Sequence, residues 1–180
     1  MTNEKKEENI AMVSAIISKL NERGCEPGKT TIQKLVFFGQ MAYNLPIEYS
    51  FEPYNYGPYS FELANDLENM EYKGILNVDY NPIIGFKIRR TEKALQDAVI
   101  LSDTINETIM KLITDWGHST PKELELFSTF LYIYKQETRG GQKISSADLI
   151  GKVRKIKYKH GDAEYTSSLN YLIEKGIIQG

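Results

Sequence analysis

Near the start of the chain the apolar residues recur at helical spacing. Ile10, Val13, Ile17 and Leu20 are three or four residues apart, with polar residues between them. This period predicts an amphipathic helix, for which Gly24 provides a stop signal. We therefore expect the chain to begin with a helix that buries one face.

A second helix is predicted to begin near Thr30. Thr30 and Gln33 have the spacing of a capping box, in which each side chain bonds to the other residue's backbone N–H. The apolar side chains beyond them extend past a single stripe and are Ile32, Leu35, Val36, Phe37, Phe38, Ala42 and Tyr43. Because so wide an apolar surface needs contacts on two sides, we expect this helix at the centre of the fold.

The period changes to two between residues 48 and 56. Tyr49, Phe51 and Pro53 occupy alternate positions, which predicts a strand, and Pro53 restricts it to an edge or a bulge. The aromatic residues here are dense enough to stack on nucleic-acid bases. No Arg or Lys lies between them, however, so we interpret them as a wall of the core.

A turn and a third helix are predicted next. Gly57 and Pro58 signal the turn, Pro58 suits the first position of a helix, and Ser60 can cap it. The helix is expected to run from about Ser60 to Lys73, where Gly74 ends it. We expect Gly57 to need a backbone conformation that a β-branched residue resists.

The segment that follows predicts a β-hairpin. Strand residues occupy 75–78 and 86–90, with turn signals between them. Helix, strand, helix and hairpin follow one another in the order of a winged helix. The hairpin 77–90 would then be the wing, and the helix 60–73 would take the place of the recognition helix.

Residues 91–180 predict helices alone. Starts are indicated at Thr91, at Ser102 or Asp103, at Thr120, at Ser145 and at Asp162. The signal at Thr120 is the strongest, because a proline and a capping-box glutamate follow it. The helix over 124–134 is apolar nearly all round, and we expect it to be buried in the core rather than against a partner. The fold class is therefore mostly α (α+β), with a winged-helix-like lobe over 1–90 and a helical extension over 91–180 on the same core.

Two short motifs carry a family likeness. Ile-Gln-Lys-Leu-Val-Phe-Phe at 32–38 and Tyr-Gly-Pro-Tyr-Ser at 56–60 resemble the YwgA-like family of prokaryotic proteins. More distantly they resemble the Panacea group of winged-helix antitoxins that includes SocA, and weaker similar positions occur at 91–94 and 120–124. The resemblance implies binding without catalysis. It also implies a protein partner such as a toxin, a protease or a regulator, because similar antitoxins pair with toxins or act as protease adaptors.

The composition fits an ordinary globular protein, since 41% of residues are hydrophobic and 26% charged. The single cysteine, Cys25, excludes an internal disulfide and fits a reducing compartment. The charged N-terminus is followed by no apolar segment long enough for a signal peptide or a membrane span. We therefore expect a cytoplasmic protein without a membrane partner, and we leave homo-oligomer formation open.

Candidate catalytic residues are few. The only histidines, His118 and His160, lie in polar segments beside glycines and have no Cys or carboxylate pair at metal-ligand spacing. We interpret both as surface residues. Gly28-Lys29-Thr30 resembles the end of a phosphate-binding loop, but Arg23 stands where its first glycine would be. The sequence therefore predicts a protein that is not an enzyme and that has no cofactor or metal site.

The charges of the helix 60–73 argue for a protein partner. The helix carries four acidic residues and one basic residue, so DNA phosphates would repel it. We therefore predict a non-enzymatic, antitoxin-like or adaptor-like protein that binds another protein. The predicted partner surface consists of Tyr54, Tyr56, Tyr59, Glu62, Asp66 and Glu68.

The alternative is a DNA-binding regulator. It would use basic residues of the wing and of a run near the C-terminus, namely Lys87, Arg89, Arg90, Lys152, Arg154, Lys155 and Lys157. The basic residues near the C-terminus can also be interpreted simply as the exposed side of an amphipathic helix. That interpretation agrees with a net charge of −2 and an isoelectric point near 5.8. Basic patches on an acidic protein are still compatible with salt-sensitive contact to phosphates.

Overall fold

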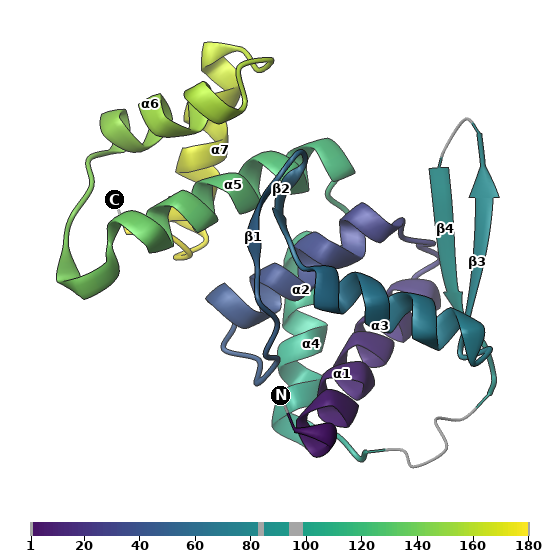
Figure 1. Ribbon diagram of the computed structural model, residues 1–180. Coiled ribbons are helices and arrows are strands. Elements are labelled where there is room, and N and C mark those ends of the chain that lie inside the picture. Colours follow the sequence, from purple (N-terminus) through teal and green to yellow (C-terminus); the bar gives the residue numbers. More distant parts are fainter. Residues whose placement is uncertain (1, 83–84, 94–98, 180) are drawn as a thin grey trace.

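The computed structural model describes residues 2–82, 85–93 and 99–179, over which the protein is mostly helical with two antiparallel hairpins (Figure 1). The helices are α1 (Asn3–Glu22), α2 (Lys29–Ala42), α3 (Phe61–Tyr72), α4 (Asp103–Trp116), α5 (Pro121–Glu137), η1 (Arg139–Gly141), α6 (Ser146–Ile156) and α7 (Asp162–Glu174). The strands are β1 (Glu52–Tyr54), β2 (Gly57–Tyr59), β3 (Leu76–Asn81) and β4 (Gly85–Arg90). The predicted α+β class with helices in excess is confirmed. None of the helices in these segments combines the length and apolar character needed to cross a bilayer.

Helix α2 lies at the centre of the fold, as its wide apolar surface predicts. Every residue from Thr31 to Gly39 is buried. On one side the Phe37 ring contacts Phe51, with ring centroids 5.1 Å apart, and on the other Phe38 stacks on Trp116 of α4 at 4.5 Å. One hydrophobic cluster therefore contains residues of α1 and α2 together with residues of α4, α5 and α7.

Several helix starts have the caps that the sequence indicates. Ser60, Ser102 and Ser145 each accept a backbone N–H in the first turn, and Thr120 forms a complete capping box with Glu123. The helix expected from Thr91 is absent at 91–93 and 99–102, and its middle, 94–98, lies outside the described residues. Local capping chemistry therefore predicts most of these boundaries.

The capping box expected at the start of α2 is wrong. Gly28 is the N-cap, and no side chain caps the helix. Gln33 instead bonds to the backbone of Ser60, accepting from its N–H at 2.9 Å and donating to its carbonyl oxygen at 2.8 Å. The Gln33 side chain therefore makes a long-range contact with Ser60 instead of capping its own helix.

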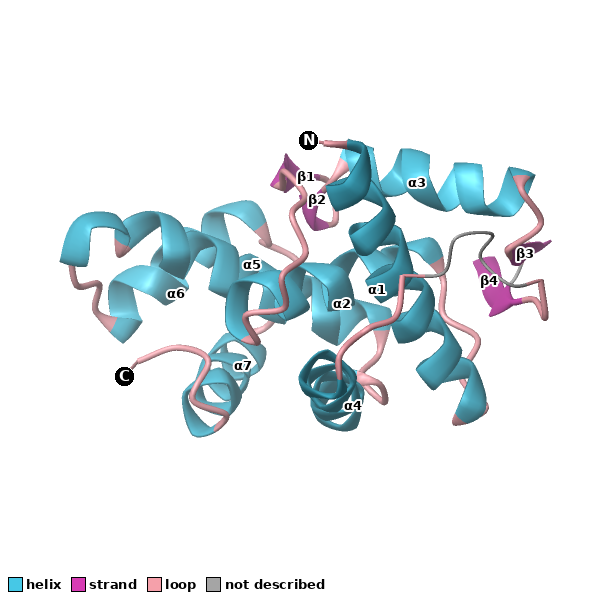
Figure 2. Cartoon of the chain, turned by 90° about the horizontal axis from the view of Figure 1, so that it is seen from below, coloured by secondary structure: helices cyan, strands magenta, loops and turns pink. Residues whose placement is uncertain are grey.

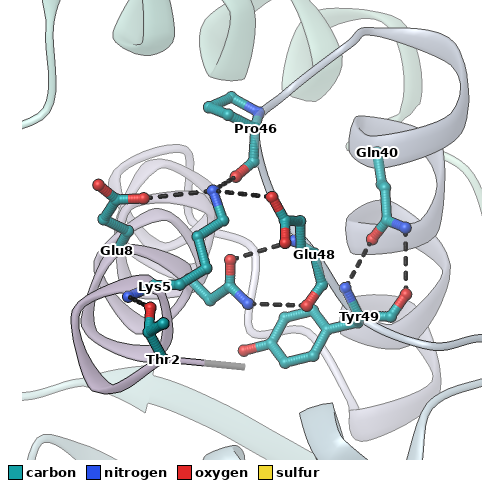
Figure 3. A network of polar contacts seen from close by, with 8 residues as sticks. Thr2, Lys5, Glu8, Gln40, Pro46, Glu48 and Tyr49 are labelled. Carbon is teal, nitrogen blue, oxygen red and sulfur yellow. Dashed lines mark hydrogen bonds and ion pairs between the residues drawn. The ribbon is translucent and has the colours of Figure 1, made fainter.

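The predicted strand at 48–56 is present only at Glu52–Tyr54. The backbone N–H groups of Glu48, Tyr49 and Ser50 bond to side chains instead of to a neighbouring strand, as Figure 3 shows for Glu48 and Tyr49. Asn9 of α1 exchanges two hydrogen bonds with Glu48, at 2.9 and 3.1 Å, and Gln40 of α2 does the same with Tyr49, at 3.0 and 3.1 Å. Two amide side chains thus take the place of strand partners.

The turn expected at Gly57 and Pro58 is displaced towards the N-terminus. Asn55 and Tyr56 form the turn, while Gly57 and Pro58 belong to β2, which pairs with β1. Pro58 is therefore not the first residue of a helix, and α3 begins after the cap at Ser60.

The second hairpin is the one expected at 77–90. Strands β3 and β4 pair from Leu76 with Arg90 to Asn81 with Gly85. Its base is attached to the helical body, because Ile88 donates to the Pro27 carbonyl oxygen and Asn21 of α1 bonds to both Ile88 and Arg90. Helices α5, α6 and α7 group at the opposite end of the molecule from this hairpin (Figures 1 and 2).

Candidate interaction surface

Aromatic rings gather on the outside of the β1–β2 hairpin and at the start of α3. The ring of Tyr54 lies 5.3 Å from that of Tyr59 and 5.7 Å from that of Phe61, and Tyr59 and Phe61 are 5.0 Å apart. Tyr54, Tyr56 and Phe61 are 49%, 62% and 55% exposed. We call Tyr54, Tyr56, Tyr59 and Phe61 the aromatic cluster. The rings of Tyr54, Tyr59 and Phe61 contact one another. Because Tyr54, Tyr56 and Phe61 are open to solvent, the core-wall interpretation is wrong for these three residues.

Beneath the hairpin lies the buried ammonium group of Lys34. Its side chain projects from the central helix α2 and donates to the Pro58 carbonyl oxygen at 2.8 Å. Only 1% of the residue is exposed. Desolvation lowers the pKa of Lys34 to about 8, with a nearby Glu125 raising it and Lys157 lowering it. At neutral pH Lys34 is therefore still mostly protonated, and its ammonium group holds β2 through the hydrogen bond to Pro58.

Lys157, which follows α6, supports the turn of the same hairpin. Its Nζ donates to the Asn55 carbonyl oxygen at 2.9 Å and lies 2.5 Å from Glu125 Oε1 of α5. The Tyr165 hydroxyl also donates to the Lys157 carbonyl oxygen. Lys157 is buried, so the structure removes it from the predicted phosphate-contacting run.

Gly57 lets β2 approach α5. Its φ of +85° lies in the left-handed region, and a Cβ atom here would be 3.0 Å from the Thr129 hydroxyl and 3.3 Å from the Glu125 carbonyl oxygen. Because Ser60 is also tied to Gln33, helices α2 and α5 both hold the hairpin and the start of α3. The aromatic cluster therefore stands on a fixed base.

The predicted acidic residues of α3 divide between the surface and the interior. Glu62 is exposed and accepts the Ser50 N–H at 3.0 Å, and Glu68 is exposed on the outer face of the helix. Asp66, only 2% exposed, accepts the Tyr49 hydroxyl at 3.0 Å and pairs with Lys6 at 3.3 Å. Burial and the Asp66 carboxylate raise the pKa of Tyr49. Asp66 thus stabilises the interior, and its inclusion in the partner surface is wrong.

The basic residues of the predicted wing, which is the β3–β4 hairpin, already have acidic or polar partners. Glu26 lies 2.9 Å from both Lys87 and Arg89, and Arg89 also pairs with Asp79. Hydrogen bonds from Lys87 and Arg89 lower the pKa of Glu26. Arg90 points towards α1, where its Nε donates to Ser14 at 3.0 Å. Lys87 and Arg89 are therefore paired with carboxylates, whereas Arg90 bonds to a neutral hydroxyl.

The C-terminal basic run is dispersed. Lys152 pairs with Glu137 at 3.0 Å and Arg154 with Asp162 at 2.8 Å. Lys155 is exposed and has no ion-pair partner among the described residues. Helix α6 and the wing lie at opposite ends of the molecule (Figures 1 and 2). The two groups of basic residues therefore do not form one patch.

The two histidines differ. His118 is exposed, whereas the His160 side chain is only 8% exposed and lies with Nδ1 3.5 Å from Glu164 Oε1. The surface interpretation is therefore wrong for His160, which lines a pocket of ≈ 420 Å³ with Lys122, Glu164 and other residues. No group of three metal-binding side chains occurs in the described part of the chain.

The chemistry of the aromatic surface consists of rings, phenol hydroxyls and carboxylates. Sequence reasoning did not identify Phe61 as a surface residue. It also did not identify Gln33 and Lys34 as the side chains that bond to the backbone beneath the aromatic cluster. The available signal was the position of Gln33 and Lys34 between the apolar residues Ile32 and Leu35 of the predicted central helix. A scan against models of protein families gave no match for this chain, nor did a search of curated proteins.

Proposed function

We propose that this chain is a non-enzymatic interaction protein that binds another protein through the aromatic cluster and the outer face of α3. The observation that carries this proposal is a group of half-exposed rings on a hairpin held by buried side chains. Tyrosine side chains supply much of the energy of protein interfaces. A surface fixed before binding also loses less conformational entropy when a partner arrives.

The partner is expected to contact side chains rather than to add a strand. Pro53 is the middle residue of β1, and Pro58 is the middle residue of β2. A proline has no N–H to donate, so it weakens the edge of a sheet as a template for another strand. The rings of the cluster are then the main source of affinity.

The element order and the two family-like motifs favour an antitoxin-like or adaptor-like role on a winged-helix-like lobe. In the place of a recognition helix, α3 exposes Glu62, Glu68 and Glu71. The wing carries arginine and lysine side chains that bond to Glu26 and Asp79. These charges favour a toxin, a protease or a regulator as partner over DNA.

Affinity capture from the native host tests the proposal. The double variant Tyr56→Ser/Phe61→Ser should lower the amount of captured partner at least about tenfold, since exposed aromatic anchors each contribute about 1–2 kcal/mol. Tyr80→Ser is the matched control, because Tyr80 is exposed on the wing. Equal capture by the double variant and the control would reject the proposal.

The DNA-binding alternative has a separate test. Fluorescence anisotropy against mixed-sequence duplex DNA, from about 50 to 200 mM salt, covers the range in which phosphate contacts weaken steeply. We expect no binding at the low-salt end. Binding that falls steeply with salt, and that Lys155→Glu weakens, would favour the regulator.

A further inference from the structure

The aromatic cluster continues along α3 as one exposed stripe. Phe61, Asn65, Glu68 and Tyr72 are separated by four, three and four residues, and all are exposed. Residues at this spacing lie on one face of a helix. Tyr72, at the far end of the stripe, is 92% exposed. The stripe therefore runs from the hairpin rings to the C-terminal end of α3.

The length of the stripe suits a short extended peptide. From Phe61 to Tyr72 the helix rises about 16 Å. An extended segment covers that distance with about five residues. The stripe is convex, so side chains of the occupant would reach between its rings and carboxylate rather than fill a cavity.

The acidic groups on and beside the stripe have no Lys or Arg partner in the described part of the chain. Glu52, Glu68 and Glu71 have no ion-pair partner among the described residues, and Glu62 bonds only to a backbone N–H. Burial and the charge of Glu68 together raise the pKa of Tyr59, in agreement with a carboxylate that acts on the cluster. Several carboxylates elsewhere in the protein do lie within 3.0 Å of a Lys or Arg nitrogen, namely those of Glu26, Asp115, Glu125, Glu137, Asp162 and Glu164.

We infer that the partner docks a basic, arginine-bearing extended segment on this stripe. This inference rests on the proposed function and names the chemistry of the partner. A guanidinium group binds a carboxylate through a fork of N–H groups and stacks on aromatic rings. The stripe offers both, since Glu68 lies between Phe61 and Tyr72 along the helix. An acidic or wholly apolar segment would leave these carboxylates without partners.

The test uses the full chain and a fluorescein-labelled ten-residue peptide in which arginine alternates with serine. The arginine peptide should bind, a glutamate version should not, and a lysine version should bind more weakly. Glu68→Gln and Phe61→Ser should each weaken binding about threefold, as exposed ion pairs and cation–π contacts do. Glu107→Gln is the matched control, because Glu107 is an exposed acid on α4.

Two results would overturn the inference: no binding of the arginine peptide, or equal effects of Glu68→Gln and Glu107→Gln. Its failure can be distinguished from failure of the proposed function. If the double variant Tyr56→Ser/Phe61→Ser lowers partner capture while the arginine peptide does not bind, the surface binds a protein of other chemistry. If capture survives all substitutions in the cluster, the proposed function itself is wrong.

Discussion

The two hairpins of this protein are held in place in opposite ways. Strands β3 and β4 pair over six residues each and attach to the body at their base, and their exposed charges pair with Asp79 of β3 and with Glu26 of the segment before α2. Strands β1 and β2 pair over three residues each and depend on Lys34 and Lys157 from outside the hairpin. A three-residue ladder with two prolines is too short to be stable alone. The buried side chains beneath β1–β2 therefore fix the position of the aromatic cluster.

The largest effect is expected at the glycine where the short hairpin meets α5. Gly57→Val should lower the free energy of unfolding by about 3 kcal/mol or more, because a strained φ and a steric clash with Thr129 act together. Gly85→Val on the wing is the matched change, since Gly85 has φ +79° but open space around it. It should cost about 1–2 kcal/mol. Urea denaturation measures both, and equal losses would show that the contact with α5 is unimportant.

Removal of a buried ammonium should cost less than the glycine change. Lys157→Met leaves the Asn55 carbonyl oxygen and Glu125 without their cation, so unfolding should become easier by about 2 kcal/mol. Lys87→Met in the wing should change stability by less than about 0.5 kcal/mol. Hydrogen exchange should show faster exchange of the amides around Asn55 in the first variant alone. Unaltered exchange there would contradict the supporting role of Lys157.

Lys34 should give the short hairpin a dependence on alkaline pH. The pKa of Lys34 is about 8 in the folded protein, against an ordinary lysine value of 10.5 once the chain unfolds, so between these values the unfolded chain binds more protons. Stability from this group should therefore rise between about pH 8 and 10, by about 1–2 kcal/mol. Comparison of the wild type with Lys34→Met isolates this rise from other titrations. Parallel pH profiles for the two proteins would show that Lys34 does not titrate in this range.

The smallest effect is expected on the wing. Glu26→Gln removes the partner of Lys87 and Arg89, but exposed pairs contribute less than about 1 kcal/mol to stability. Thermal unfolding should therefore change little. Lys87 would then lack an acidic partner, and at most weak, salt-sensitive binding to duplex DNA should appear. A large gain in DNA affinity would show that Glu26 masks a real phosphate-binding surface.

Sequence reasoning succeeds here where the governing contact is local. Ser60, Ser102 and Thr120 cap helices through residues three positions away, and the turn signals of the wing lie within the segment that they shape. The wide apolar surface of α2 likewise predicts its central place.

It fails where distant parts of the chain meet. Gln33 follows the pattern of a capping box but bonds to Ser60, and Asn9 reaches across to the backbone of Glu48. Lys157 and Asp66 look like ordinary surface charges in the sequence, yet both are buried against partners far away in the chain. Charge patterns along a helix do not reveal such pairings, because the partner is chosen by the tertiary fold.

The stacking of Trp116 on Phe38 gives the protein an internal fluorescent reporter. Trp116 is the sole tryptophan, is fully buried, and contacts Phe127 of α5 and Tyr171 of α7 as well as α2. Its indole N–H donates to the Tyr43 hydroxyl at 2.6 Å. Separation of the C-terminal helices from the first half would expose the indole to water and shift its emission to longer wavelength. One spectrum can thus tell whether a variant of the binding surface has kept its two halves together.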